Sequence, residues 1–245
     1  MDFLTIFFNE ILYKPLFNAL VLLYKYLPGH DFGIAIITLT ILIKLIFYPF
    51  TTKSIVSQKS LQDLQTKLQE IQKKYKDDKE RMVQATMELY KKEKINPFSG
   101  CLPVLIQLPI LIALYQVFRK GFLPEQTQFL YSFVSNPGPI NPYLLNIIDL
   151  SKPNVYLAIL SGFMQFFQTK MISDKNQKKN QLQKAKIEIG QKTEEILQKQ
   201  MIYFFPFLTI AILWQLPSAI GLYWSVSSLF SIGQQYLILN KKITI

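Results

Sequence analysis

Long apolar runs that alternate with charged stretches constrain this chain more than any other feature of its sequence. Half of the 245 residues are apolar, and the mean hydropathy is +0.19 although the chain carries 27 Lys and Arg. A membrane helix needs about twenty apolar residues, and five runs approach or reach that length. The runs predict an all-α polytopic membrane protein with five spans, at about residues 33–51, 100–119, 154–172, 201–216 and 218–239.

The N-terminal region has a different character. Residues 3–27 are rich in Phe, Leu and Tyr, but they include four residues that suit a span poorly: Glu10, Lys14, Pro15 and Lys25. This mixture favours an amphipathic helix at the membrane surface over a further span. We therefore expect residues 1–32 to form an external, interfacial amphipathic helix ahead of a membrane core at residues 33–240.

The first two predicted spans are separated by a highly charged stretch, residues 53–95, with eleven basic and seven acidic residues. Asp77 and Asp78 supply a turn and an N-cap for a helix that begins near Lys79. Before them, apolar residues recur at alternating spacings of three and four, as in the seam of paired helices: Leu61, Leu64, Leu68, Ile71 and Tyr75. The pattern predicts a polar helical hairpin.

Lys and Arg are distributed unevenly between the two sides of the predicted membrane. The hairpin, the basic loop 173–200, Lys170 and the tail 241–245 hold 21 of them, whereas five lie opposite and Lys44 lies between. Because basic loops remain in the cytoplasm, we expect the hairpin, the loop and the C-terminus inside and the N-terminus outside. The same distribution argues against DNA binding, since the charge sets topology instead.

A single lysine, Lys44, interrupts the uncharged run of the first span. A lysine near the centre of a membrane helix costs about 2.5–3.5 kcal/mol on insertion scales, so it usually faces a partner, a cavity or a substrate path. The alternative is that the Lys44 side chain snorkels to the membrane surface. The end of the apolar run, at Phe50, is about 9 Å further along the helix, and the side chain reaches only part of that distance. Thr40 shares the face of Lys44, which favours a hydrated cavity.

Polar residues recur at helical spacing on other spans as well. Asn154, Ser161, Gln165 and Gln168 lie on one face of the third span, and the fifth has a similar stripe. Hydrogen bonds between helices explain any one stripe by itself. Several stripes together with the lysine indicate a hydrated groove. Its candidate lining residues are Lys44, Thr40, Gln107, Gln165, Trp224, Ser227 and Ser231.

The spans contain no catalytic motif: no paired carboxylates, no nucleophile with a base, no metal cluster and no phosphate loop. The single cysteine, Cys101, and the single histidine, His30, form no ligand set. We expect no enzyme activity, cofactor or metal. A small ion or solute transporter is the second hypothesis, because an intramembrane lysine also marks coupling sites. The lack of a visible internal repeat argues against it.

Three long stretches resemble the YidC/Oxa1/Alb3 family of membrane protein insertases, in particular its bacterial YidC-like members. They are GIAIITLTILIKLIFYPFTTKS, INPFSGCLPVLIQLPILIALY and PSAIGLYWSVSSLFSIGQQYLI, which begin at Gly33, Ile95 and Pro217. Their order and the charged sequence between the first two also match, so the resemblance covers about residues 10–240.

The resemblance implies a five-helix core around a hydrophilic groove that is open to cytoplasm and lipid and closed on the outer side. Family members accept nascent membrane proteins there and release their apolar segments sideways into the bilayer, without nucleotide hydrolysis. The family's groove arginine falls on Lys44, a groove threonine on Thr40 and an aromatic position on Trp224. Lysine keeps the charge but lacks the paired donors of arginine, so we expect attraction of an acidic client tail rather than a clamp.

By the same resemblance the protein lies in the bacterial plasma (inner) membrane, with nascent membrane proteins and the lipid bilayer as partners. The hairpin is then an early contact for the client. Basic residues of loop 173–200 and of the Lys241-Lys242 tail either contact ribosomal RNA or simply hold the topology. The sequence leaves open whether the protein acts alone or beside a Sec translocon.

Overall fold

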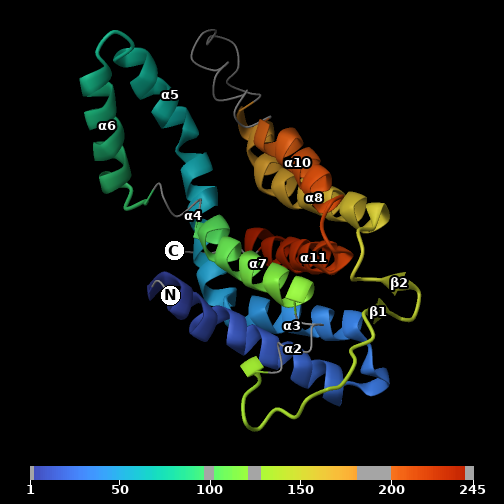
Figure 1. Ribbon diagram of the computed structural model, residues 1–245. Helices are drawn as coiled ribbons and strands as arrows, with labels where there is room; N and C mark the ends of the chain where they lie inside the picture. Colours follow the sequence, from blue (N-terminus) through green and yellow to red (C-terminus); the bar gives the residue numbers. More distant parts are fainter. Residues whose placement is uncertain (1–2, 97–101, 121–127, 181–199, 241–245) are drawn as a thin grey trace. The chain divides into compact units, whose positions relative to one another are not determined.

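The computed structural model describes residues 3–96, 102–120, 128–180 and 200–240, most of them helical (Figure 1). Predictions that concern Cys101, most of loop 173–200 and the tail 241–245 fall outside the described residues. The chain forms two compact units. The first comprises Met1–Phe47, Val104–Gln165 and Pro206–Phe230, and the second comprises Tyr48–Pro103, Phe166–Phe205 and Ser231–Ile245.

The first unit begins with a nearly continuous helical stretch, made of α1 (Phe3–Phe8), a π-helical turn (Asn9–Tyr13) and α2 (Lys14–Tyr26). By length and composition, Thr5–Tyr26 could cross a membrane. The surface position therefore stays a prediction, with a span as its alternative. One face of the stretch is buried in the core of the unit, at Tyr13, Phe17, Leu20, Val21 and Tyr24.

A tight turn, Pro28–His30, reverses the chain into α3 (Phe32–Ile46), which lies beside α2 (Figure 1). Gly29 has a φ of 83° in this turn, a conformation that glycine adopts without steric cost. Asp31 then caps α3, because its Oδ1 accepts a hydrogen bond of 2.9 Å from the N–H of Ile34.

The predicted first span, 33–51, is interrupted in the structure. α3 ends at Ile46, and a new helix, α4 (Tyr48–Asp63), starts after Phe47. Pro49 provides a physical reason, since proline has no N–H to continue the hydrogen-bond ladder and suits the first turn of a helix. The last residues of the predicted span thus belong to α4.

The remaining predicted spans correspond to helices with partly different limits. α7 (Leu102–Lys120) and α11 (Ser218–Asn240) match closely, and α8 (Val155–Asn180) continues beyond the predicted end at residue 172. The fourth predicted span, 201–216, begins with a π-helical turn (Gln200–Phe204). Its α-helix, α10 (Phe205–Leu213), ends before the predicted limit at residue 216.

Few described helices meet a simple length and composition test for crossing a membrane. Thr5–Tyr26 meets it. α3 and α4 meet it only if the two helices count as one span. Two further apolar stretches, Leu105–Arg119 and Ile202–Leu213, are shorter than the test requires. The chain is helical, and the five-span arrangement stays a prediction.

Between α7 and α8 runs an irregular stretch, residues 128–152, which we call the connecting segment. It contains a small antiparallel hairpin of β1 (Tyr143–Leu144) and β2 (Ile148–Asp149), in which Tyr143 pairs with Asp149. Leu150 and Val134 are buried in the core of the first unit. The segment is thus packed onto the helices of that unit.

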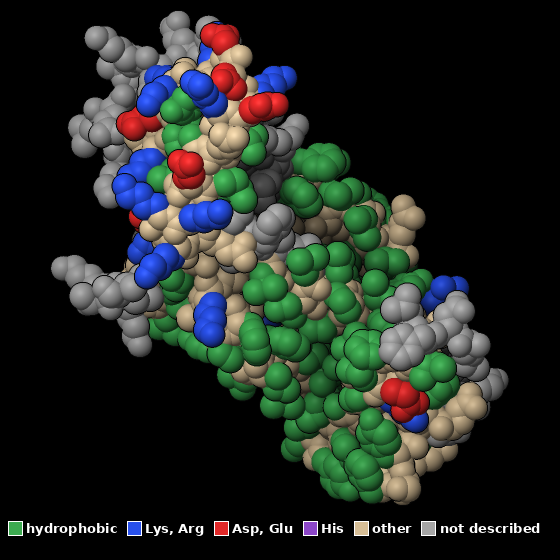
Figure 2. Space-filling view, turned by 90° about the vertical axis from the view of Figure 1, so that its left-hand side faces the viewer, with side chains coloured by type: hydrophobic (Ala, Val, Ile, Leu, Met, Phe, Trp, Pro, Cys, Tyr) green, Lys and Arg blue, Asp and Glu red, His purple; other side chains and the backbone are tan. Residues whose placement is uncertain are grey.

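The second unit contains the predicted hairpin. α5 (Gln65–Lys74) and α6 (Lys79–Lys92) lie side by side (Figure 1). Asp78 caps α6 as the sequence predicts, and its carboxylate accepts from the N–H of Arg81 at 3.0 Å. Figure 2 shows the charged side chains gathered over this hairpin, whereas apolar side chains cover much of the surface of the first unit.

An ion pair joins the two arms of the hairpin, with Lys67 Nζ 2.6 Å from Glu93 Oε1. The hydrogen bond and the charge of Lys67 hold the pKa of the Glu93 carboxyl below its usual value. The pair therefore stabilises the hairpin above the unfolded pKa of glutamate, about 4.3, and the stabilisation is lost as the pH falls through the lower folded pKa.

Removing the lysine is expected to raise the pKa of Glu93 back toward its ordinary value. An NMR titration of the Glu93 side chain in Lys67→Gln and wild-type protein measures this shift. Lys73→Gln, on the same helix, is the control and is expected to leave the titration unchanged. Equal Glu93 titrations in wild type and Lys67→Gln would show that the pair does not persist in solution.

Candidate functional site

Lys44 and Thr40 lie one turn apart on α3, at the edge of its buried face. Thr40 is buried and Lys44 is half-buried, whereas the neighbouring Leu45 and Ile46 are exposed. The Thr40 hydroxyl donates a 2.6 Å hydrogen bond to the carbonyl of Ile36 in its own helix. Its oxygen retains the capacity to accept a hydrogen bond from another group.

Gln107 connects two helices of the first unit. Its Nε2 on α7 donates to the Tyr223 hydroxyl on α11 at 2.6 Å, and the Tyr223 side chain is buried. A buried tyrosine hydroxyl normally has such a partner, because leaving it unpaired is costly.

Gln165 lies at a junction of three helices. Its Oε1 on α8 accepts from the Thr209 hydroxyl on α10 at 2.6 Å and from the Trp224 Nε1 on α11 at 3.0 Å. Two of the predicted groove residues, Gln165 and Trp224, are thus brought together. Thr209 also belongs to this junction, although the sequence analysis did not single it out. The sequence signal that could have identified it is its position as a lone polar residue in an apolar run.

One turn earlier on α8, Ser161 forms a second polar junction. Its hydroxyl lies 2.8 Å from the carbonyl of Gly221 and 2.9 Å from the hydroxyl of Ser225, both on α11. The sequence leaves two interpretations for such residues, a groove lining or contacts between helices. For Gln107, Gln165 and Trp224, the structure contains hydrogen bonds between helices.

All serines and glutamines of α11 are buried, beside apolar residues such as Ile220 and Tyr223, and large apolar side chains lie on its exposed side. Leu229, Tyr236 and Leu237 are exposed, whereas its serines and glutamines are buried: Ser218, Ser225, Ser227, Ser228, Ser231, Gln234 and Gln235. Exposed apolar side chains with every serine and glutamine buried are expected where lipid is the solvent. Ser227 belongs to the first unit and Ser231 to the second.

Chemically, these residues offer hydrogen-bond donors and acceptors and one cation. No three His, Cys, Asp or Glu side chains in the described parts of the chain could together hold a metal ion. Such a set suits reversible contacts with polar groups of another chain.

Comparison with known proteins identifies the family. The family model described as "60Kd inner membrane protein" matches residues 22–244. A protein of Fusobacterium nucleatum named "Membrane protein insertase YidC" is 38% identical over 213 residues, which are 86% of this chain and 87% of that one.

Proteins with the same name from Syntrophus aciditrophicus and Geobacter metallireducens are 39% and 34% identical over 233 and 235 residues. These matches cover 93% and 95% of this chain, but only 36% and 37% of the length of those relatives. The chain therefore belongs to the 60Kd inner membrane protein family, the YidC/Oxa1/Alb3 family that its sequence resembles.

Proposed function

We propose that this protein inserts nascent membrane proteins into the bacterial inner membrane. The observation that carries the proposal is the 38% identity to a named insertase, 87% of whose length is matched. The burial pattern of α11 supports a role in lipid, since large apolar side chains are exposed while its serines and glutamines are buried.

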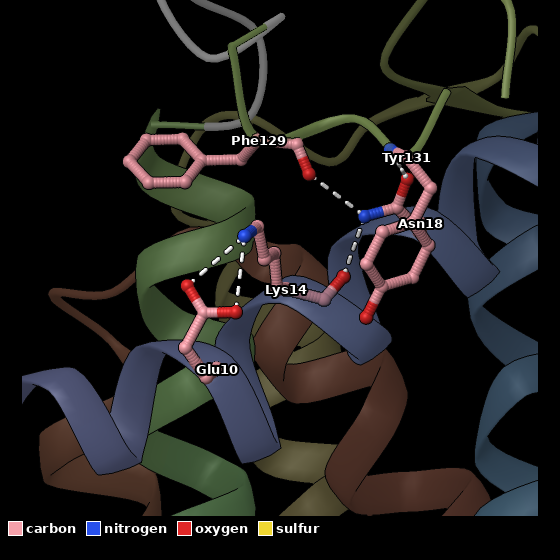
Figure 3. A network of polar contacts seen from close by, with 5 residues as sticks. All are labelled: Glu10, Lys14, Asn18, Phe129 and Tyr131. Atoms are coloured by element: carbon pink, nitrogen blue, oxygen red, sulfur yellow. Dashed lines mark hydrogen bonds and ion pairs between the residues drawn. The ribbon is translucent and has the colours of Figure 1, made fainter. Parts of the chain in front are cut away.

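The proposed topology places five spans in the membrane, the N-terminus outside, and the hairpin and C-terminus in the cytoplasm. The contacts of α2 support a surface position for it. Asn18 bonds to Phe129 and Tyr131 (Figure 3), and Tyr24 bonds to Asn141, so irregular backbone accompanies α2 along much of its length. Irregular backbone that is exposed to hydrocarbon is not tolerated, so these contacts support a position of this helix outside the bilayer core.

The proposed mechanism uses a hydrophilic groove between the spans. Lys44 attracts an acidic residue of the client tail, and polar groups offer it transient hydrogen bonds: Thr40, Gln107, Gln165, Trp224, Ser227 and Ser231. Several of these groups already have partners within the protein, such as Tyr223 for Gln107. A client therefore exchanges one hydrogen bond for another.

Such an exchange has a small free-energy cost, because a hydrogen bond contributes only about 1 kcal/mol net. The client's apolar segment then moves sideways into lipid, which is favourable by about 0.8 kcal/mol for each buried CH₂ group. These magnitudes make insertion possible without nucleotide hydrolysis and without a catalytic residue. Contacts with the ribosome, through the cytoplasmic basic residues, belong to the same proposal, as does action beside a Sec translocon.

The proposal is tested with purified protein in liposomes and a purified client that has a short acidic tail and one apolar segment. We expect the tail to become protected from external protease in the absence of nucleotide, well above the level in empty liposomes. Protection equal to that in empty liposomes contradicts the proposal. Flux of small ions or solutes through the same vesicles, without insertion, would favour the transporter hypothesis instead.

A further inference from the structure

The first turn of α4 is bonded to the last turns of α11, residues 231–240, by one buried amide. Gln234 on α11 is only 3% exposed. Its Nε2 donates to the hydroxyl oxygens of Thr51 and Thr52, both at 2.9 Å, and to the carbonyl of Tyr48 at 3.1 Å. The Thr51 hydroxyl also donates to Gln234 Oε1 at 3.1 Å. Both ends of the amide thus contact the same turn of α4, and all four residues belong to the second unit.

α4 continues into the hairpin almost without interruption (Figure 1). Leu64 alone separates α4 from α5, and its φ of −80° and ψ of −9° lie in the right-handed helical region. Its N–H donates to the carbonyl of Ser60 at 3.1 Å, and its carbonyl accepts from the N–H of Leu68 at 3.0 Å. At 1.5 Å per residue, the stretch from Tyr48 to Lys74 is about 40 Å long. Gln234 therefore contacts one end of a long helical arm, and the turn of the hairpin follows the other end.

The base of this arm needs a contact of this kind. The helical ladder is interrupted at Phe47, and Pro49 in the first turn of α4 has no N–H to restore it. Continuity of the backbone therefore does not fix the direction of α4 by itself. A rotation of about 10° at the base would displace a point 40 Å away by about 7 Å.

The neighbouring glutamine on α11 makes no such contact. Gln235 is 2% exposed, yet within the described part of the chain its Oε1 has no hydrogen-bond partner. A buried acceptor without a partner is destabilising, whereas the bonded amide of Gln234 stabilises the contact that it makes. The two side chains are equal in size and similarly buried, so they form a matched pair for substitution.

We propose that Gln234 is a positioning residue that fixes the base of the hairpin to the end of α11. We call Gln234, Tyr48, Thr51 and Thr52 the α4–α11 joint. With the joint closed, the hairpin keeps one direction relative to the last turns of α11 and moves together with them. The consequence for clients rests on the insertase function proposed above, because a client that contacts the hairpin then meets it in a fixed place. The joint itself does not rest on that function.

Spin labels test the joint in full-length protein in nanodiscs. Lys73→Cys on α5 and Tyr236→Cys on α11 label two exposed positions, in a Cys101→Ser background. Pulsed electron paramagnetic resonance should give one narrow distance distribution. In Gln234→Leu we expect the distribution to be at least twice as wide, because about 10° of freedom at the base moves the α5 label by several ångström. Gln235→Leu is the matched control and should leave the width unchanged.

Substitutions on the other helix give an independent measurement. Thr51→Val together with Thr52→Val removes the hydroxyl contacts and nearly keeps the size of both side chains, so we expect a similar widening. Adding Gln234→Leu should widen the distribution little further, because the same bonds are already lost. The joint is overturned if the threonine pair leaves the width unchanged, or if Gln235→Leu changes it as much as Gln234→Leu. The threonine substitutions are mild, so this result does not depend on whether Gln234→Leu folds.

A cleavable crosslink tests the consequence for clients. Thr51→Cys with Gln234→Cys, in the Cys101→Ser background, removes the amide, and a short methanethiosulfonate crosslinker can replace its bonds. We expect insertion to be about three- to tenfold below wild type without the crosslinker, to return with it, and to fall again on reduction. Wild-type insertion without the crosslinker, or low insertion with it, would overturn the positioning role. A wild-type protein that inserts no client would count against the insertase function, and the spin labels would still decide the joint.

Discussion

Insertion of clients with acidic tails is expected to fall about tenfold in Lys44→Ala. A carboxylate about 4 Å from an ammonium gains on the order of 4 kcal/mol at an effective dielectric constant of about 20. Loss of water from both groups offsets much of this, and a net 1.4 kcal/mol corresponds to about tenfold. The protease-protection assay with purified client measures the change.

Two control variants and one control client separate charge from structure in this experiment. Lys44→Arg keeps the charge and should retain insertion, and Lys53→Ala removes an exposed lysine from α4 and should have little effect. A client with an uncharged tail should be inserted equally by wild type and Lys44→Ala. Wild-type activity of Lys44→Ala on several acidic clients would exclude a role for this charge.

The largest effect on stability is expected from Gly162→Ala, where α8 and α10 lie in contact. A Cβ there would come 2.4 Å from Ile210 Cγ1 and 2.9 Å from the Pro206 carbonyl oxygen. The isoleucine can move, but the carbonyl is part of the backbone, so the helices must separate. Overpacking of this kind costs about 1–3 kcal/mol, which thermal unfolding of the purified protein measures.

Gly233→Ala is the matched control for this substitution, because Gly233 lies within α11 and a Cβ there meets nothing within 4 Å. It should stabilise the protein by about 0.5–1 kcal/mol through the better helix propensity of alanine. Adding Ile210→Ala to Gly162→Ala should recover part of the loss. A Gly162→Ala protein as stable as the Gly233→Ala protein would show that α8 and α10 are not packed this closely.

Helical periodicity predicted which faces of the helices are polar, and local chemistry predicted the start of α6. Asp78 caps that helix, as its position before Lys79 indicates. The interruption at Phe47 was also accessible from the sequence through Pro49, but the apolar run masked it. Such features depend on a few neighbouring residues, so sequence reasoning reaches them.

Hydrogen-bond partners on different helices could not be predicted from the sequence. Periodicity placed Gln165 and Trp224 on polar faces, yet it does not specify that one carbonyl oxygen accepts from both Trp224 and Thr209. The role of Asn18 has the same origin, since its bonds to Phe129 and Tyr131 join residues more than a hundred positions apart. Which faces meet is decided by the packing of whole helices, and no local pattern encodes it.

The attachment of the connecting segment has a consequence for the protein's own synthesis. The segment bonds to Asp31 near the beginning of the chain and to Ser218 near its end. At about 5–20 residues per second, a ribosome needs roughly 10–40 s to make the chain between these two residues. During that interval α2 and α3 are already made but lack the start of α11. The first unit is thus completed only when the start of α11 has been made, and its early helices wait for this partner.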